Sequence, residues 1–140
     1  MLKNRIVPII NENDTVSIKE LMFTDNDELS GLVAEMMKAQ LLIILSNVDG
    51  VFTGNPDEPE SELIRIVEAE DDYSQCVSAS KSKYGRGGMM TKMKTAKQVA
   101  VNGIEVRIAN GTRQNILLDV ILNPENAVCT RFLTHKTKKQ

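Results

Sequence analysis

Apolar residues follow a helical period in one segment and form short continuous runs in others. Between residues 28 and 38 they fall at i, i+3, i+4, i+7 and i+8, which predicts a helix with one apolar face. That face consists of Leu29, Leu32, Val33, Met36 and Met37. Residues 25–27, Asp-Asn-Asp, stand where short polar side chains cap a helix. Residues 41–45 are apolar throughout, which predicts a strand covered on both faces.

Strand-like and helix-like stretches alternate along the rest of the chain. We expect further strands at residues 6–10, 63–67, 105–109 and 129–133. A helix that opens near residue 88 has the inner face Met89, Met93, Ala96 and Ala100, and a helix over residues 114–122 has the inner face Ile116, Leu117, Val120 and Ile121. This order predicts an α/β fold with a largely parallel sheet flanked by helices, whose ligands bind at the carboxyl ends of the strands.

The composition supports one globular domain. The 140 residues are 41% hydrophobic and 26% charged, which excludes extended disorder. The run at 41–45 is far shorter than the roughly 20 residues that a membrane-spanning helix needs, and the first residues do not read as a secretory signal. Cys76 and Cys129 form no C-x-x-C pair, so neither a zinc site nor a disulfide framework is expected. We therefore expect a cytoplasmic protein that binds no membrane.

Charge is balanced overall but unevenly distributed. With 17 basic and 19 acidic residues, the net charge is −2, and with only five aromatic residues a nucleic-acid partner is not expected. Residues 57–72 carry eight acids, whereas residues 73–104 carry none. The acid-free stretch holds Lys81, Lys83, Arg86, Lys92, Lys94 and Lys97. A solvated basic helix face is one interpretation, and an anion site is the other.

Glycines within this basic stretch favour the anion site. Residues 85–92 read GRGGMMTK, which is neither a Walker A loop nor a complete dinucleotide fingerprint. Glycines let backbone N–H groups approach phosphate oxygens, and the helix that follows presents its positive N-terminus to the same charge. Lys92 lies one turn into that helix, within reach of a phosphoryl group. A flexible loop with a surface lysine remains an equal alternative on this segment alone.

Two other polar clusters precede or follow predicted strands and helices. Residues 25–27 need only one side chain for capping, so a second carboxylate is available to hold a lysine or approach a nucleotide. Residues 11–14, NEND, suit either a turn or a site for a small zwitterionic substrate. His135, the single histidine, lies in the basic tail, so a hydrolase with a histidine base is disfavoured.

Taken in order, these segments resemble the amino acid kinase family. The resemblance covers about residues 5–133 and rests on IVPIINENDTV, FTDNDELSGLVA, LLIILSNVDGVFTGNP, GRGGMMTKMKTAKQVAVNGI and VRIANG. The DG-V-F/Y-T-x-N/D-P loop and the GG-M-x-T-K segment are common in several members. NEND together with DND-x-L-S resembles the glutamate 5-kinases in particular.

The resemblance implies an ATP-dependent phosphorylation of the L-glutamate γ-carboxylate, which gives glutamyl 5-phosphate in proline biosynthesis. Asp27 would orient catalytic lysines, and Lys92 would stabilise charge on the transferred group. Asp14 and Asn26 would bind glutamate, assisted by Asn11 and Asn13. Backbone groups would wrap the nucleotide at Arg86, Gly87, Gly88, Met89, Met90, Thr91 and Lys92, with Ser46 and Asn47 flanking it. Mg²⁺ would accompany ATP with few direct protein ligands, so no metal-ligating residues are assigned.

The chain departs from the family pattern in two ways. Ser46 and Asn47 stand where the family often has Thr-Asp, so a carboxylate is lost there. The family's first half, with its Lys-x-Gly-Ser lysine and its Ser/Gly-rich segment, matches nothing in this sequence. We therefore expect residues 1–134 to be the C-terminal, nucleotide-binding part of an amino acid kinase domain, followed by a polar tail at 135–140 and no PUA domain.

Three functional hypotheses follow. The first is a glutamate kinase segment that is active only with its first half supplied, as a homo-oligomer in the complete enzyme. The second is a non-catalytic nucleotide-binding or assembly module derived from such a kinase. The third is a sister kinase acting on acetylglutamate, aspartate or a nucleoside monophosphate, which NEND makes the least favoured.

Overall fold

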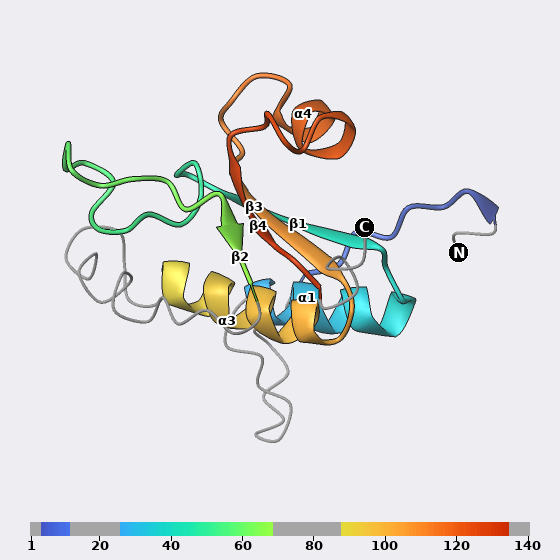
Figure 1. Cartoon of the computed structure of the whole chain (residues 1–140). Coiled ribbons are helices and arrows are strands. Elements are labelled where there is room, and N and C mark those ends of the chain that lie inside the picture. The colour runs from blue at the N-terminus through green and yellow to red at the C-terminus, as the bar shows by residue number, and fades with distance from the viewer. Residues whose placement is uncertain (1–3, 12–25, 69–87, 135–140) are drawn as a thin grey trace.

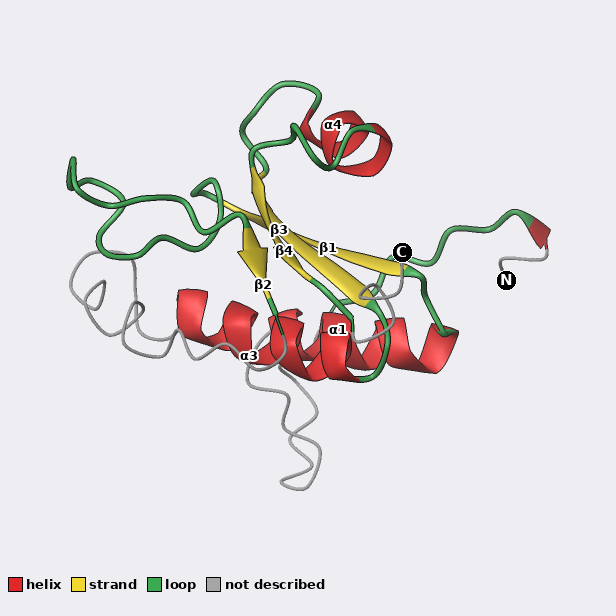
Figure 2. Ribbon diagram, in the orientation of Figure 1, coloured by secondary structure: helices red, strands yellow, loops and turns green. Residues whose placement is uncertain are grey.

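A mixed sheet lies between two helical layers. The computed structural model describes residues 4–11, 26–68 and 88–134 (Figure 1). The elements are α1 (Asn26–Met37), β1 (Leu41–Ser46), β2 (Ile66–Val67), α3 (Gly88–Val101), β3 (Glu105–Asn110), α4 (Ile116–Leu122) and β4 (Cys129–Phe132). Figure 2 shows α1 and α3 side by side on one face of the sheet and α4 on the opposite side. The expected α/β architecture is confirmed.

The strand order is β1-β3-β4-β2. Within the described residues, β1 pairs with β3 and β2 pairs with β4 in parallel, whereas β3 and β4 are antiparallel. The parallel register of β1 and β3 runs from Leu41 opposite Glu105 to Ser46 opposite Asn110. The loops that follow β1 and β3 therefore leave the sheet at the same edge, which is the carboxyl end of both strands.

The larger core lies between the sheet and the helices α1 and α3. Met93, Ala96 and Ala100 of α3 are buried in it, as the helical spacing predicts. The expectation for α1 is wrong in one respect. The helix forms, but the predicted apolar face is not its buried face, because Met36 and Met37 are 73% and 50% exposed. The buried positions of α1 are Asp27, Gly31 and Ala34.

The smaller core lies on the opposite face, beneath α4. Ile116 and Val120 of α4 pack there against Ala109 and Cys129. Arg107 reaches the same layer and donates a hydrogen bond to the Val120 carbonyl oxygen. The outer residues of α4 remain exposed, among them Leu117 and Ile121, which the sequence pattern had placed inside. A helix of this length covers the sheet with only two of its apolar side chains.

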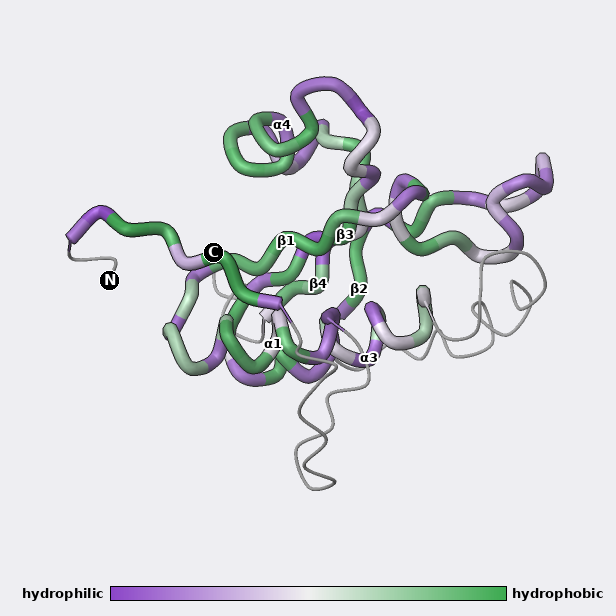
Figure 3. The backbone as a smooth tube through the Cα atoms, turned by 180° about the vertical axis from the view of Figure 1, so that it is seen from behind, coloured by the Kyte–Doolittle hydropathy of each residue, from purple (hydrophilic) through white to green (hydrophobic). Residues whose placement is uncertain are grey.

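Residues 6–10 do not form the expected strand. They belong to an extended segment in which Val7 and Ile9 are 79% and 98% exposed. Figure 3 shows this segment and α4 as apolar stretches at the periphery of the described chain. No described helix has the length and apolar character that crossing a bilayer requires. The tail at 135–140 lies outside the described residues.

Glu105, a carboxylate on β3, makes the stability of the fold depend on pH. Glu105 accepts hydrogen bonds from Nε of Arg107 at 2.9 Å and from Nε of Arg131 at 3.1 Å. Burial is the largest single influence and opposes ionisation of Glu105, but the two arginines together outweigh it, so its pKa lies below the usual value. Such a group contributes stability that is present above its unfolded-state pKa, about 4.3, and is lost as the pH falls through the folded-state pKa.

We therefore expect the free energy of unfolding to fall below about pH 4.3 with a slope that Glu105→Gln reduces. Urea unfolding at pH 7, 4 and 3 measures this slope, and Glu60→Gln, on an exposed loop residue, is the control. Equal slopes in the wild type and in Glu105→Gln would show that Glu105 does not contribute to the pH dependence.

Candidate active site

The N-termini of α1 and α3 meet near the carboxyl end of the sheet. Residues 38–40 connect α1 to the start of β1, and residues 102–104 connect α3 to the start of β3. Each helix therefore runs back along the strand that follows it, so that its first turn lies toward the end of that strand (Figure 1). Because helix N-termini carry a partial positive charge, this edge of the sheet favours anionic ligands.

One ion pair joins the beginnings of the two helices. Nζ of Lys92 lies 2.7 Å from Oδ2 of Asp27, although the residues are 65 positions apart in the chain. Asp27 lies in the first turn of α1, where the Ser30 hydroxyl donates a hydrogen bond to its carbonyl oxygen at 2.7 Å. The Asp27 side chain is only 12% exposed and the Lys92 side chain only 18% exposed. The structure thus brings together the two residues that the resemblance marks as catalytic.

Close helix packing sets the distance between the two partners. A Cβ atom on Gly31 of α1 would lie 2.8 Å from Cγ2 of Thr95 and 3.1 Å from Cγ2 of Val99, so the helices approach more closely than a larger residue allows. At the far end, Asn102 Nδ2 donates a hydrogen bond to Oε1 of Glu35 at 2.8 Å. The Asp27–Lys92 pair is therefore supported by contacts along the helix interface.

Most of the expected nucleotide residues lie within the described part of the chain, and two lie outside it. The described ones begin α3 and are Gly88, Met89, Met90 and Thr91. Ser46 ends β1 and is half-buried, and Asn47 follows it as an exposed residue. Arg86 and Gly87 lie outside the described residues. Residues 88–91 and Ser46 thus lie at the same carboxyl edge of the sheet as Lys92.

Two of the four expected glutamate residues lie beyond the described ranges. Asn26 opens α1, next to Asp27. Asn11 is exposed at the end of the N-terminal segment, and Asn13 and Asp14 lie outside the described residues. Across residues 4–11, 26–68 and 88–134, no group of three or more His, Cys, Asp or Glu side chains is arranged to hold a metal ion.

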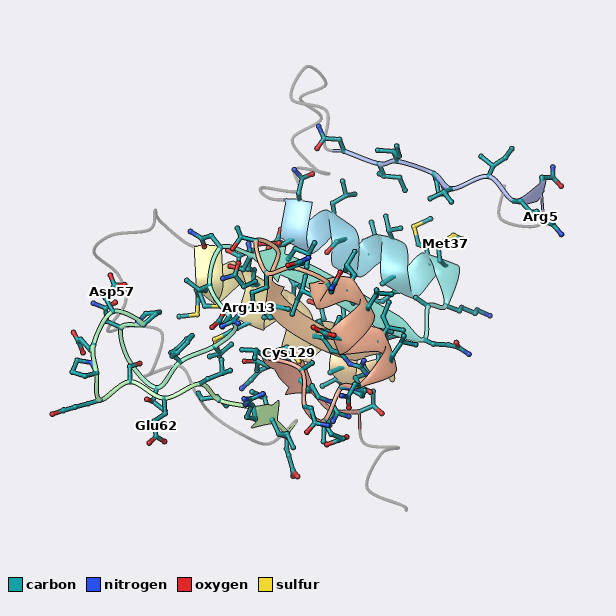
Figure 4. The ribbon with its side chains drawn as sticks, turned by 90° about the horizontal axis from the view of Figure 1, so that it is seen from above. Arg5, Met37, Asp57, Glu62, Arg113 and Cys129 are labelled. Carbon is teal, nitrogen blue, oxygen red and sulfur yellow. The ribbon has the colours of Figure 1, made fainter. Side chains whose placement is uncertain are left out.

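A second polar cluster ties the loops after β1 and β3. Asp49 accepts two hydrogen bonds from Arg113, one from Nε and one from Nη2, both at 2.6 Å. Asn110 Nδ2 donates a third bond to Asp49 at 3.1 Å. The Gly111 N–H donates to the Ser46 carbonyl oxygen at 2.9 Å. Figure 4 shows Arg113 near the centre of the view, whereas Asp57 and Glu62 lie on the loop that extends away from the sheet.

Sequence reasoning did not select this cluster. The hydrogen bond from Arg113 lowers the pKa of Asp49, burial opposes that shift, and the Asn110 amide and nearby arginine charges reinforce it. The same contact raises the pKa of Arg113. The partners are 64 positions apart, so no local motif joins them. The available signal was that Asp49 and Arg113 each follow a segment expected to be a strand of a largely parallel sheet, residues 41–45 and 105–109.

Comparisons of the sequence give a consistent result. A family model described as the amino acid kinase family matches residues 1–110. The glutamate 5-kinase of Bacteroides thetaiotaomicron is 58% identical over 133 residues, which cover 95% of this chain and 37% of the relative. That of Chlorobaculum tepidum is 46% identical, covering 99% of this chain and 38% of the relative. The chain thus spans well under two thirds of these relatives.

Comparisons of the structure show the fold. Carbamate kinase from Giardia lamblia, solved with AMP-PNP, matches with a TM-score of 0.54 at 19% identity, over 79% of this chain and 35% of the other. UMP kinase from Ureaplasma parvum matches with a TM-score of 0.55 at 15% identity, over 80% and 43%. Together with the family model and the sequence relatives, these matches establish that the chain belongs to the amino acid kinase family.

Proposed function

We propose that this chain is the nucleotide-binding part of a kinase that transfers the terminal phosphoryl group of ATP to the γ-carboxylate of L-glutamate, in proline biosynthesis. The Asp27–Lys92 ion pair is the observation that carries the proposal. It places a lysine ammonium, held by a carboxylate, where two helix N-termini converge. The relatives named glutamate 5-kinase support the choice of acceptor. On this proposal, residues 1–134 form the C-terminal part of the kinase domain.

The reaction requires positioning and charge stabilisation more than proton transfer. A γ-carboxylate oxygen attacks the γ-phosphorus, an O–P bond forms, and the bond from that phosphorus to the β,γ-bridging oxygen breaks to release ADP. The attacking carboxylate is already ionised at neutral pH, so no general base is needed. Lys92 stabilises negative charge on the transferred group, and Asp27 fixes the direction of its ammonium.

Other residues hold the two substrates. Backbone N–H groups at the start of α3, residues 88–91, bind phosphate oxygens, and Ser46 and Asn47 flank the nucleotide at the end of β1. Asp14 and Asn26 bind glutamate, with Asn11 and Asn13 beside them. Mg²⁺ bound to the nucleotide would neutralise charge on its phosphates, and no residue of this chain is assigned as its ligand.

The second candidate function is suggested by the length of the relatives. Because the chain spans 37% of its Bacteroides thetaiotaomicron relative, a module that binds nucleotide without turnover is the second candidate function. The two are separated by a glutamate-dependent ADP-release assay with hydroxylamine trapping of the acyl phosphate. We expect no product from the 140-residue chain and product from a version extended upstream with the remainder of the kinase domain. Absence of product from a folded extended version would favour the non-catalytic module.

Nucleotide binding is testable on the chain itself. We expect MgATP to raise its melting temperature, because a ligand that binds only the folded state at ten times its Kd adds about 1.4 kcal/mol, or roughly 5 °C for a domain of this size. MgAMP, which lacks the β- and γ-phosphates, should give a smaller shift. Differential scanning fluorimetry measures both. Equal shifts would contradict recognition of the phosphates by α3 and Lys92.

A further inference from the structure

The turn after β1 is anchored at both ends, and Arg113 fixes the part between. We propose that Arg113 is a positioning residue for the nucleotide: through its two-pronged contact with Asp49 it holds the turn that carries Ser46 and Asn47. This inference rests on the proposed function, in which those two residues flank ATP. Neither Arg113 nor Asp49 belongs to the residues that the family resemblance assigns to nucleotide or substrate.

The contact has the geometry of a strong ion pair. Both carboxylate oxygens of Asp49 are engaged by different nitrogens of one planar guanidinium, each at 2.6 Å. A fork of this kind restricts orientation as well as distance, which a lysine at the same position cannot do. The Asp49 side chain is 23% exposed and the Arg113 side chain is 46% exposed, so only the carboxylate is partly shielded from water and counter-ions. The two-pronged geometry, rather than burial, distinguishes this contact from an ordinary surface pair.

The loop that carries Arg113 is itself fixed to the end of β1. The Asn110 side-chain oxygen accepts hydrogen bonds from the Thr112 N–H at 3.0 Å and from the Thr112 hydroxyl at 2.7 Å, which shapes the turn. The Gly111 N–H bonds to the Ser46 carbonyl oxygen. A Cβ atom on Gly111 would lie 3.2 Å from Cβ of Leu45, so the loop lies close against β1. Arg113 therefore extends from a defined support.

On its other side the turn is held by β4. The Val51 N–H donates a hydrogen bond to the buried Thr130 hydroxyl at 2.8 Å. A Cβ atom on Gly50 would lie only 2.4 Å from the same hydroxyl oxygen. Residues 47–49 thus bridge two fixed points, and the Ser46 hydroxyl contact with Asn47 Oδ1 is long, at 3.4 Å. Between these points Asp49 is held by the Arg113 guanidinium and, at 3.1 Å, by the Asn110 amide.

A direct contact of Arg113 with phosphate is the competing explanation. The two explanations predict different effects of Arg113→Lys and Asp49→Asn on MgATP affinity. If Arg113 positions the turn, then Arg113→Lys and Asp49→Asn both weaken MgATP binding, because each removes the fork. If Arg113 binds phosphate by its charge, Arg113→Lys retains binding, and Asp49→Asn strengthens it by freeing the cation.

The experiment measures MgATP affinity by calorimetry and amide hydrogen exchange of residues 46–51 without nucleotide, on the full 140-residue chain. We expect each variant to lose about 3- to 10-fold in affinity, the double variant to lose no more than the larger single loss, and exchange in the turn to speed up. Asn126→Ala, which removes an exposed side-chain hydrogen bond to Asn123 beyond the end of α4, should change neither readout.

The outcomes separate this inference from the proposed function. Absence of MgATP binding by the wild-type chain would refute the proposed function and this inference with it. Binding by the wild type that the variants leave unchanged would refute only the inference, even if exchange accelerates, because the contact would then be merely structural. Tighter binding by Asp49→Asn would replace it with the direct phosphate contact.

Discussion

Replacing Lys92 by alanine is expected to lower turnover about 100- to 1000-fold in a protein that carries the whole kinase domain, with a much smaller effect on folding. The ammonium is the positive charge that α3 contributes at the point where α1 begins, 2.7 Å from Asp27. Its stabilising effect is needed most when charge builds up on the transferred phosphoryl group. The assay is glutamate-dependent hydroxamate formation at saturating MgATP.

The same helix supplies a matched control. Lys94 lies two residues further along α3, is 74% exposed, and is 4.0 Å from Glu28. Lys94→Ala removes the same charge from the same helix but should leave turnover within about twofold, because exposed pairs at such distances contribute little. Asp27→Asn should lower turnover while retaining MgATP binding. Unchanged turnover in Lys92→Ala would refute the role assigned to that lysine.

Periodicity predicted the elements of this fold better than it predicted their buried faces. The strand at residues 41–45 and the inner face of α3 were predicted correctly. The expected cover on both faces of that strand is incomplete, because β1 lies at the edge of the described sheet and Leu45 is 47% exposed. In α1, however, the apolar stripe is not the buried side. The contact with α3 is made at Gly31, whose missing side chain permits close approach but contributes no hydrophobic signal. A pattern of apolar residues therefore indicated the helix and misplaced its packing face.

The site shows a similar division. Asp27 and Lys92 were chosen because each lies in a motif that resembles a family segment, and the fold brings them into contact. Asp49 and Arg113 were missed, because their pairing depends on the register of β1 against β3 and on loop shape, neither of which leaves a spacing in the sequence. The antiparallel pairing of β4 with β3 was likewise invisible in the order of elements.

Replacing Thr130 by valine is expected to destabilise the fold by about 2–5 kcal/mol. The Thr130 hydroxyl accepts a hydrogen bond from the Val51 N–H at 2.8 Å and donates one to the Ile64 carbonyl oxygen at 2.7 Å. It thereby closes the neck of the loop between those residues, and all three residues are buried. Valine has the same branched shape but no polar atom, so it leaves a donor and an acceptor unsatisfied. Urea unfolding measures the loss.

Crowding adds to the cost of the lost hydrogen bonds. Gly50 lies so close to the Thr130 hydroxyl that a Cβ atom there would be 2.4 Å away, and a methyl group in place of the hydroxyl is larger. Thr130→Ser keeps the oxygen and removes only a methyl group, so it should cost about 1 kcal/mol. If valine and serine are equally tolerated, the hydroxyl does not hold the loop neck. If Thr130→Ser lowers the free energy of unfolding as much as Thr130→Val does, packing of the Thr130 methyl group dominates instead.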